Sequence, residues 1–379
     1  MKKVLLVFGT RPEAIKMAPV HAELRDVPGI EVRVAVTAQH REMLDQVLDL
    51  YKISADYDLN IMSHSQNLED VTVNSLNGMG NILNHYVPDI VVVHGDTTTT
   101  LSASLTSYYQ KIPVAHVEAG LRTGNIYAPW PEEINRKVVS SIAHLHFAPT
   151  EESVANLQAE AVSEQSIFLT GNTVIDSLIR TVDVLESDDD LSRKLDEEFA
   201  LDPSKRMILV TAHRRENFGD GLKDIFTALL ELAKRNDIQI VYPLHPNPNV
   251  NFLARSMMDN VDSIKLIDHQ DYMKFVHLMR RSYIIMTDSG GIQEEAPSLG
   301  KPVLVMRDVT ERPEAVTAGT VKLVGTDANL ILREVNALLD YREIYDGMAR
   351  AHNPYGDGLA SKRIVDAIVN YLRRSEMNA

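Results

Sequence analysis

Three carboxylates follow apolar segments of the chain, where they could carry out acid–base chemistry. Asp96 comes shortly after the apolar run at residues 90–93, and Glu118 directly follows residues 114–117. Glu132 lies in the loop after Glu118. Acids that share one site are costly unless one is protonated, paired or titrating, and such clusters supply general acids and bases. Each could instead belong to a structural ion pair, and Asp96, which precedes a run of threonines, could cap a helix.

A glycine-containing turn at residues 287–296, with the sequence TDSGGIQEEA, could hold a phosphate group. Residues 283–286 are apolar and β-prone and good helix formers come next, so the turn should join a strand to a helix. Its central residues are Ser289, Gly290 and Gly291. Glycines let backbone N–H groups approach a ligand, and a helix N-terminus favours an anion. Glu294 or Glu295 could then hold a ribose hydroxyl, although an ordinary tight turn explains the same pattern.

Basic side chains at other strand ends could neutralise a diphosphate. Arg11 and Lys16 follow the first apolar run, residues 4–8. Open α/β sheets bind ligands at the carboxyl ends of their strands, so Arg11 could stabilise a diphosphate, unless it is an ordinary surface residue. His213 follows a strand-like run and could donate to a phosphate oxygen or shuttle a proton. Arg312 is a second positive group of this kind.

These positions depend on a repeated alternation of short apolar runs with longer amphipathic segments. The runs lie at residues 4–8, 32–36, 90–93, 114–117, 147–148, 207–210, 238–242, 264–267, 283–286 and 303–306. Such a pattern is typical of a parallel sheet covered by helices on both faces. It restarts after about residue 170, and 379 residues exceed a usual single core, so we expect two doubly wound α/β domains facing each other across a cleft. Residues 185–199 should form an acidic helix near their junction.

Composition and charge argue against several classes of protein. The net charge of −15, from 38 basic and 53 acidic residues, argues against a nucleic-acid or anionic-membrane partner. The absence of cysteine excludes a disulfide, a thiolate metal site and a cysteine nucleophile. The first apolar run is too short for a signal peptide, and no run approaches the length of a membrane span. We therefore expect a soluble, cytoplasmic protein.

The motifs of common cofactors are missing. The Gly-x-Gly pieces at Gly78, Gly219 and Gly356 lack the third glycine of the dinucleotide fingerprint, and no Gly-Lys-Ser/Thr phosphate loop occurs. His144 and His146 would share one face of a strand, where core or interface histidines are a simpler interpretation than a metal site. We expect no NAD, no ATPase activity, no metal and no other cofactor.

Several motifs in order resemble those of the bacterial non-hydrolysing UDP-N-acetylglucosamine 2-epimerases. They lie at residues 9–17, 94–99, 116–122, 131–133, 213–217, 287–297, 310–314 and 353–358. The resemblance implies the glycosyltransferase-B architecture, with two Rossmann-like domains, a homodimer and a UDP-sugar in the cleft. The first domain would contain residues 1–170 and a C-terminal helix at about 359–379 that packs back on it, and the UDP-binding domain residues 171–358.

The resemblance also implies roles for individual residues. The catalytic group would be Asp96, Glu118, Glu132 and His213. The UDP-sugar would be bound by Arg11, Lys16, Asp96, Glu118, Arg136, His213, Gln270, Phe275, Ser289, Gly290, Gly291, Glu295 and Arg312. Activation by a second substrate molecule would involve Gln39, Glu42, Arg214 and His245.

The implied reaction interconverts UDP-GlcNAc and UDP-ManNAc and would supply ManNAc units for cell-surface polysaccharide. No carbonyl activates the hydrogen at sugar C2, so we expect UDP to leave C1 as that hydrogen is lost, giving 2-acetamidoglucal, and then to add back. Three alternatives stay open: a glycosyltransferase of the same architecture, a hydrolysing epimerase, and a non-catalytic UDP-sugar sensor.

Overall fold

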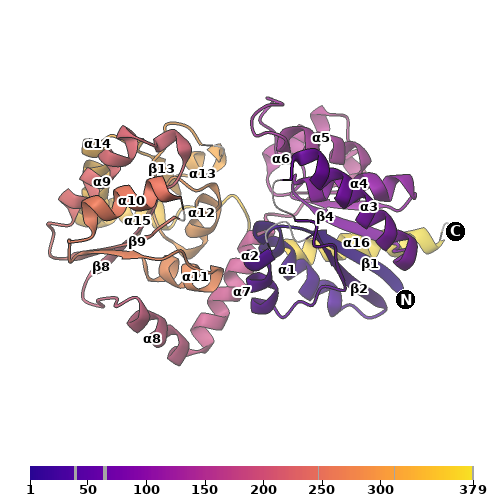
Figure 1. Ribbon diagram of the computed structural model, residues 1–379, viewed down its shortest axis with the longest axis horizontal. Helices are drawn as coiled ribbons and strands as arrows, with labels where there is room; N and C mark the ends of the chain where they lie inside the picture. Colours follow the sequence, from indigo (N-terminus) through magenta and orange to yellow (C-terminus); the bar gives the residue numbers. More distant parts are fainter. Residues whose placement is uncertain (38–40, 63–65, 246, 311, 378–379) are drawn as a thin grey trace. The chain divides into compact units, whose positions relative to one another are not determined.

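Two compact units, each built around one parallel sheet, make up the chain in the computed structural model (Figure 1). The structure describes residues 1–37, 41–62, 66–245, 247–310 and 312–377. Met1–Ser177 and the segment that begins at Tyr355 form the first unit, and Leu178–Pro354 form the second.

The first unit contains a seven-stranded sheet in the order β3-β2-β1-β4-β5-β6-β7, and its described pairings are all parallel. Its strands are β1 (Lys2–Phe8), β2 (Ile30–Val36), β3 (Tyr57–Asp58), β4 (Ile90–His94), β5 (Val114–Val117), β6 (Leu145–Ala148) and β7 (Ile167–Leu169). The chain moves outward from β1 to β3 and then returns to β4 on the other side of β1. Doubly wound sheets bind ligands outside the carboxyl ends of the strands at such a reversal.

Helices connect these strands, and the first begins at the reversal. The connecting helices are α1 (Arg11–Arg25), α2 (Arg41–Leu50), α3 (Leu68–Tyr86), α4 (Thr98–Tyr109), α5 (Glu132–Ile142), α6 (Glu151–Ala159) and the 3₁₀ turn η1 (Glu164–Ser166). Helix α7 (Thr173–Ser187) follows the last strand and continues into the second unit, and α16 (Ala360–Met377) comes after the second unit. Helix α1 starts with a capping box, in which Thr10 and Glu13 satisfy each other's backbone N–H groups. The cap fixes where the chain turns from β1 into the helix that carries Arg11 and Lys16.

Helix α16 returns the end of the chain to the first unit. It packs against α1 and lies beside it in Figure 1. Buried Asp176, on α7, caps its N-terminus by accepting hydrogen bonds from the backbone N–H groups of Ala360 (3.2 Å) and Ser361 (2.7 Å). The first unit is therefore completed by residues far apart in the sequence.

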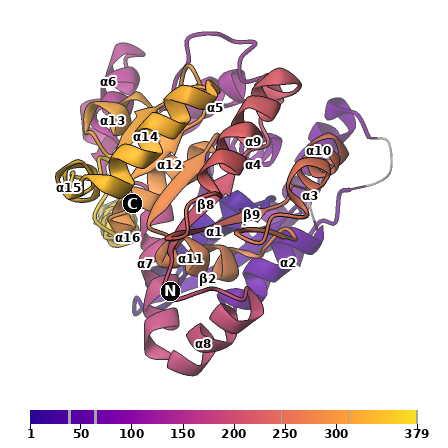
Figure 2. The ribbon, with the colours of Figure 1, turned by 90° about the vertical axis from the view of Figure 1, so that its left-hand side faces the viewer.

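The second unit contains a six-stranded sheet in the order β10-β9-β8-β11-β12-β13, again with parallel pairings. Its strands are β8 (Arg206–Thr211), β9 (Ile238–Pro243), β10 (Ile264–Ile267), β11 (Ile284–Thr287), β12 (Val303–Val305) and β13 (Val321–Leu323). Its other elements are α8 (Asp189–Glu198), η2 (Arg215–Asn217), α9 (Asp220–Leu232), α10 (Pro248–Met258), α11 (Tyr272–Arg281), α12 (Gly290–Glu295), η3 (Ala296–Leu299), α13 (Pro313–Thr317), α14 (Ala328–Asp340) and α15 (Arg342–Ala349). Helices α9 and α14 pack together over the sheet (Figure 2).

The apolar runs correctly predicted ten of these strands, with shifts of one or two residues at several ends. The edge strands β3, β7 and β13 were missed because each has only two or three residues and includes exposed positions. The acidic helix expected within residues 185–199 is present as α8 (Asp189–Glu198), but it begins four residues later than predicted. Helix α7 ends at Ser187, and Asp188 starts α8 by accepting the Leu191 N–H at 2.9 Å.

Within the described ranges, no helix is both long and apolar enough to cross a lipid bilayer.

Candidate active site

Glu118 is held by other side chains at the carboxyl edge of the first sheet. It directly follows β5, and its Oε2 forms an ion pair with the Lys16 ammonium. The same oxygen accepts a hydrogen bond from Asn172 Nδ2 at 2.9 Å and lies 3.8 Å from His94 Nε2. The sequence predicted Lys16 and Glu118 as separate site residues, and the structure brings them into direct contact.

The backbone of Glu118 is strained. Its φ angle of 63° lies in the left-handed region, which costs a residue with a Cβ about 1–2 kcal/mol. Strain of this kind persists where the surroundings impose it, often at functional sites. Gly95, at the end of β4, also has positive φ, and a Cβ added there would lie 3.9 Å from Glu118 Oε1. The loops after β4 and β5 therefore converge on the Glu118 carboxylate.

Asp96 is fixed from helix α5. Its carboxylate forms an ion pair with Arg136, and its carbonyl oxygen accepts a hydrogen bond from Asn135 Nδ2 at 2.8 Å. Asp96 does not cap α4, because the N-cap is Thr97. Of the two alternatives for Asp96, helix capping is therefore wrong, and ion pairing is present.

Glu133 holds Arg136 in place, although the sequence analysis assigned it no role. It is fully buried and accepts a hydrogen bond from Arg136 Nη1 at 3.3 Å. It also accepts the backbone N–H groups of Thr123 and Gly124, at 3.2 and 3.1 Å. One buried carboxylate thus fixes the partner of Asp96 and the loop before α5. Its spacing from Arg136 on a predicted helix, i to i+3, was the available signal.

Glu132 and Arg11 occupy the first positions of α5 and α1. Both are half-buried, and Glu132 makes no hydrogen bond or ion pair with the part of the chain that is described. Burial lowers the pKa of Arg11, so its guanidinium would gain from an anionic partner. Two of the predicted residues are therefore placed where a ligand could engage them.

Glu13 links the turn after β1 to the turn after β4. Its buried carboxylate accepts the N–H groups of Gly9 (3.0 Å) and Thr10 (2.8 Å). It also accepts the hydroxyls of Thr97 (2.7 Å) and Thr100 (3.3 Å). Burial raises its pKa, and these hydrogen bonds act in the opposite direction. The sequence analysis missed Glu13, which the Thr-x-x-Glu spacing of a capping box could have revealed.

Three buried histidines lie on neighbouring strands of the first sheet, His94 on β4, His116 on β5 and His146 on β6. Burial lowers the pKa of His94 to about 4, that of His116 to about 3 and that of His146 to about 4. His116 Nε2 is 2.7 Å from the carbonyl oxygen of Gly95. Among the described residues, no group of three or more His, Asp or Glu side chains is arranged to hold a metal ion.

In the second unit, His213 is anchored by Asp288. The fully buried Asp288 Oδ2 accepts the backbone N–H groups of His213 (2.6 Å) and Arg214 (2.7 Å) and a hydrogen bond from Asn217 Nδ2 (3.3 Å). Its Oδ1 lies 3.4 Å from His213 Nδ1. Asp288 belongs to the turn predicted from the sequence, but the sequence indicated no role for it. Its backbone partners lie more than 70 residues away, which no local pattern reveals.

His213 also stacks on His245. The two rings are parallel within 5°, and their centroids are 4.8 Å apart. Burial lowers the pKa of His213, whereas Asp288 acts to raise it and His245 to lower it. The Nδ1 atom of His245 accepts the Asn247 N–H at 3.1 Å, which leaves Nε2 to carry the proton of a neutral ring.

The turn after β11 has the predicted strand-to-helix form, but its helix is short. Helix α12 has six residues and continues as the 3₁₀ turn η3, which ends at Leu299 and has Gly300 as its C-cap. The N–H of Ser289 already donates to Thr287 Oγ1 at 2.8 Å. The expected contribution of a helix dipole is therefore weaker than predicted, and anion binding here would depend more on nearby cations.

The two candidate ribose ligands have different surroundings. Glu294 is buried and forms an ion pair with Arg312, which the sequence placed near the phosphates. Glu295 accepts a hydrogen bond from the Tyr272 hydroxyl at 2.6 Å, and its Oε2 lies 4.0 Å from a Cβ added at Gly291. Glu295 is thus the carboxylate that faces the Ser289–Gly291 turn.

The remaining predicted residues are less closely grouped. Gln270 donates to the carbonyl oxygen of Asp268 at 2.7 Å, and Phe275 is half-buried on α11. The proposed activation site would use Arg214 and His245 in the second unit and Glu42, on α2 of the first. The fourth candidate, Gln39, lies outside the described residues.

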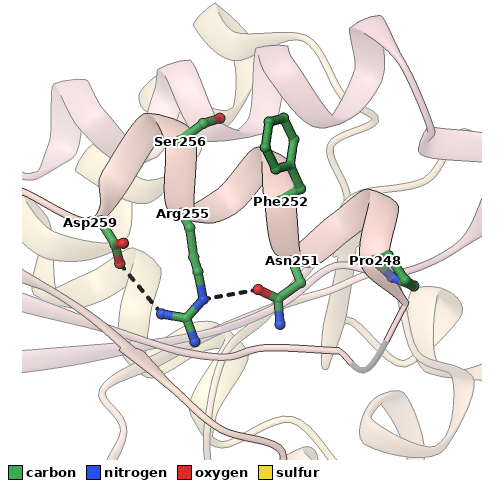
Figure 3. Close-up of a pocket in the computed structure, with 6 residues that line it drawn as sticks. All are labelled: Pro248, Asn251, Phe252, Arg255, Ser256 and Asp259. Atoms are coloured by element: carbon green, nitrogen blue, oxygen red, sulfur yellow. Dashed lines mark hydrogen bonds and ion pairs between the residues drawn. The ribbon is translucent and has the colours of Figure 1, made fainter.

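A pocket on α10 contains none of the predicted residues. Figure 3 shows its lining, which comes from one face of that helix: Pro248, Asn251, Phe252, Arg255, Ser256 and Asp259. Arg255 donates to Asn251 Oδ1 at 2.9 Å and pairs with Asp259 at 3.6 Å. The pocket's two charged side chains, Arg255 and Asp259, thus pair with each other, and Arg255 also lies 3.8 Å from Asp268 outside the lining.

Two parallel sheets with interleaved helices define an α/β enzyme of glycosyltransferase-B-like architecture. The family model for UDP-N-acetylglucosamine 2-epimerase matches residues 22–369. The chain is 58% identical over 371 residues to the UDP-N-acetylglucosamine 2-epimerase of Escherichia coli (strain K12), and the match covers 97% of this chain and 98% of that one. The chain therefore belongs to the UDP-N-acetylglucosamine 2-epimerase family, and it is an isomerase.

Solved structures agree with this assignment. The UDP-GlcNAc 2-epimerase from Neisseria meningitidis bound to UDP-GlcNAc is 53% identical, with a TM-score of 0.89 and coverage of 97% of this chain and 100% of that one. The S. aureus MnaA–UDP co-structure is 46% identical, with a TM-score of 0.86 and coverage of 98% and 97%.

Proposed function

We propose that this enzyme reversibly interconverts UDP-GlcNAc and UDP-ManNAc by eliminating UDP to 2-acetamidoglucal and adding it back. The observation that carries the proposal is the pairing of two carboxylates with cations at one edge of the first sheet. Glu118 pairs with Lys16, and Asp96 pairs with Arg136. The family assignment supplies the substrate, and we infer that the product feeds cell-surface polysaccharide.

The proposed mechanism follows from the weak acidity of the hydrogen at C2. Without a neighbouring carbonyl, a C2 carbanion would be too unstable, so loss of the C2 proton must accompany departure of UDP from C1. The bonds broken are C2–H and C1–O, and a C1–C2 double bond forms. Re-addition of UDP at C1 with protonation of C2 from the other face gives the epimer. The reaction needs a base, an acid on the opposite face, and cations for the diphosphate.

The first unit could supply both proton-transfer groups. We infer that Glu118, Asp96 and Glu132 share these roles. Paired Glu118 and Asp96 are held in fixed orientations, and Glu132 has no internal partner among the described residues. Arg11 and Lys16, on α1 beside these acids, would bind the departing diphosphate.

The second unit could supply the nucleotide site. We infer that Ser289, Gly290 and Gly291 approach the phosphates, that Glu295 holds a ribose hydroxyl, and that His213 and Arg312 stabilise the leaving diphosphate. Each preorganised donor at developing charge is typically worth about 3–4 kcal/mol of transition-state stabilisation. Gln270 and Phe275 would complete the nucleotide contacts.

Proton NMR in D₂O tests the proposal directly. We expect UDP-GlcNAc to give UDP-ManNAc with deuterium at C2 and the nucleotide still attached in both sugars. Free ManNAc with UDP would indicate the hydrolysing class, and turnover only with an added sugar acceptor would indicate a transferase. Binding without any change at C2 would leave a UDP-sugar sensor.

We also infer that the enzyme is a homodimer and that a second substrate molecule activates it through Gln39, Glu42, Arg214 and His245. The dimer should have twice the chain mass of 42.4 kDa in light scattering. Activation should appear as a sigmoidal dependence of rate on UDP-GlcNAc concentration.

A further inference from the structure

His94 is a buried histidine whose ring makes no hydrogen bond to the described chain. It is the last residue of β4, and the residue is only 3% exposed. Neither Nδ1 nor Nε2 has a hydrogen-bond partner there. Buried polar side chains nearly always have such a partner, and leaving one without destabilises the fold. Burying this ring without a hydrogen-bond partner therefore lowers the stability of the folded protein.

The Glu118 carboxylate is an acceptor close to this ring. In the parallel register of β4 and β5, His94 lies opposite Val117, so His94 and Glu118 are neighbours at the sheet edge. His94 Nε2 is 3.8 Å from Glu118 Oε2, just beyond hydrogen-bond distance. That oxygen is already engaged by Lys16 and Asn172. The imidazole thus lies next to a carboxylate oxygen that already accepts hydrogen bonds from two other side chains.

The charged and titratable groups around His94 favour a neutral donor. Burial has the largest effect on its pKa and lowers it, whereas Glu118 from the loop after β5 acts to raise it and Lys16 from α1 to lower it. His116 on β5 is also close, and His94 acts to lower the pKa of His116. Burial outweighs Glu118 and lowers the pKa of His94 to about 4. A neutral imidazole has one N–H, and a carboxylate only accepts, so the compatible tautomer carries the hydrogen on Nε2.

We propose that His94 is a positioning residue that donates to Glu118 Oε2 when a diphosphate draws the Lys16 ammonium away from it. The inference deepens the proposed function, on which it rests, because that function assigns Lys16 to the substrate. His94 would need to close a gap of 3.8 Å to hydrogen-bond distance. The Glu118 carboxylate would then keep its orientation while it exchanges a charged donor for a neutral one.

This exchange couples substrate binding to the basicity of Glu118. A hydrogen bond from an ammonium is stronger than one from a neutral N–H, and donors to a carboxylate lower its pKa. Glu118 is therefore a weaker base in the free enzyme, held by Lys16, than in the substrate complex, held by His94 and Asn172. Glu118 would therefore become more basic when substrate binds.

The test compares two pH profiles of the purified full-length enzyme with UDP-GlcNAc. The profile of kcat/KM reports the free enzyme, and that of kcat reports the substrate complex. His94→Phe keeps a ring but removes the donor. In this variant we expect the acid limb of the pH profile of kcat to shift to higher pH by roughly one unit. Maximal kcat should fall about tenfold. The acid limb of kcat/KM should stay in place, because Lys16 still holds Glu118 in the free enzyme.

Two further variants separate positioning from general damage. His94→Gln retains an N–H donor and should recover most of the kcat and the wild-type limb. His146→Phe removes another buried ring, on β6, to which we assign no role in the reaction, and should leave both limbs in place. Thermal unfolding of each variant confirms that it is folded.

The proposal is overturned if His94→Phe moves both limbs equally, moves neither, or loses no more kcat than His146→Phe. It is also overturned if His94→Gln is as impaired as His94→Phe. Wild-type enzyme that does not exchange the C2 hydrogen of UDP-GlcNAc would instead remove the proposed function, and this inference with it. The same assay therefore distinguishes the two failures.

Discussion

At the scale of single residues, the paired carboxylates are the centre of the proposed chemistry. Asp96 and Glu118 each have a cationic partner and a second contact that fixes the side chain or its loop. Because a carboxamide cannot act as a base, Asp96→Asn and Glu118→Gln should each lower kcat by about 100-fold or more. Nucleotide affinity should change only a few-fold, since neither residue is proposed to touch the nucleotide base.

Steady-state kinetics and calorimetric titration with UDP provide these two measurements. Glu231→Gln is the matched control, because it neutralises an exposed carboxylate that pairs with Lys234 on the surface. Near wild-type turnover in both site variants would remove the catalytic assignment.

Sequence patterns predicted where the strands end, but they did not predict which side chains contact one another at those ends. Asp96, Glu118 and His213 follow strands, and runs of apolar residues show where strands end. Glu133 and Asp288 were missed, because their value lies in buried contacts with backbone N–H groups of other segments. Only folding brings Asp288 to its backbone partners, so no spacing within one element predicts them. For Glu133, its i to i+3 spacing from Arg136 was the one local signal.

At the scale of elements, the turn after β5 depends on glycine for two different reasons. Gly120 and Gly124 have φ angles of +91° and +76°. A Cβ at Gly120 would also lie 2.2 Å from the carbonyl oxygen of Ser153, whereas nothing lies within 4 Å of a Cβ at Gly124. A substitution at Gly124 would therefore add backbone strain alone, whereas one at Gly120 would add both strain and a steric clash.

Gly124→Ala should therefore lower the free energy of unfolding by about 1 kcal/mol, the cost of left-handed backbone alone. Gly120→Ala should lower it by roughly 2–3 kcal/mol more, because α6 must move away from the turn. Urea unfolding followed by circular dichroism measures both. Equal effects of the two substitutions would contradict the predicted clash.

At the scale of the whole molecule, buried neutral histidines should make the first unit sensitive to acid. Burial lowers the pKa values of His94, His116 and His146 to about 4, 3 and 4. In the unfolded chain each titrates near 6.5, so the unfolded state takes up protons first as the pH falls. Stability is therefore intact above pH ~6.5 and is lost as the pH falls from there towards the folded-state values.

Each histidine should contribute roughly 1 kcal/mol of this loss at pH ~5.5. Urea unfolding of the first unit at several pH values measures the slope. His146→Phe should make the slope shallower, because one of the buried histidines with a strongly lowered pKa is removed. An unchanged slope in that variant would contradict the link between burial and acid sensitivity.

The return of α16 to the first unit has a consequence for synthesis on the ribosome. Residues 1–177 emerge first, yet Asp176 must wait for Ser361 and Ala360, and α1 must wait for α16. The second unit is continuous and can finish folding in the meantime. The unit that contains the paired carboxylates is thus the first to be translated and the last to be complete, because its fold needs residues from both ends of the chain.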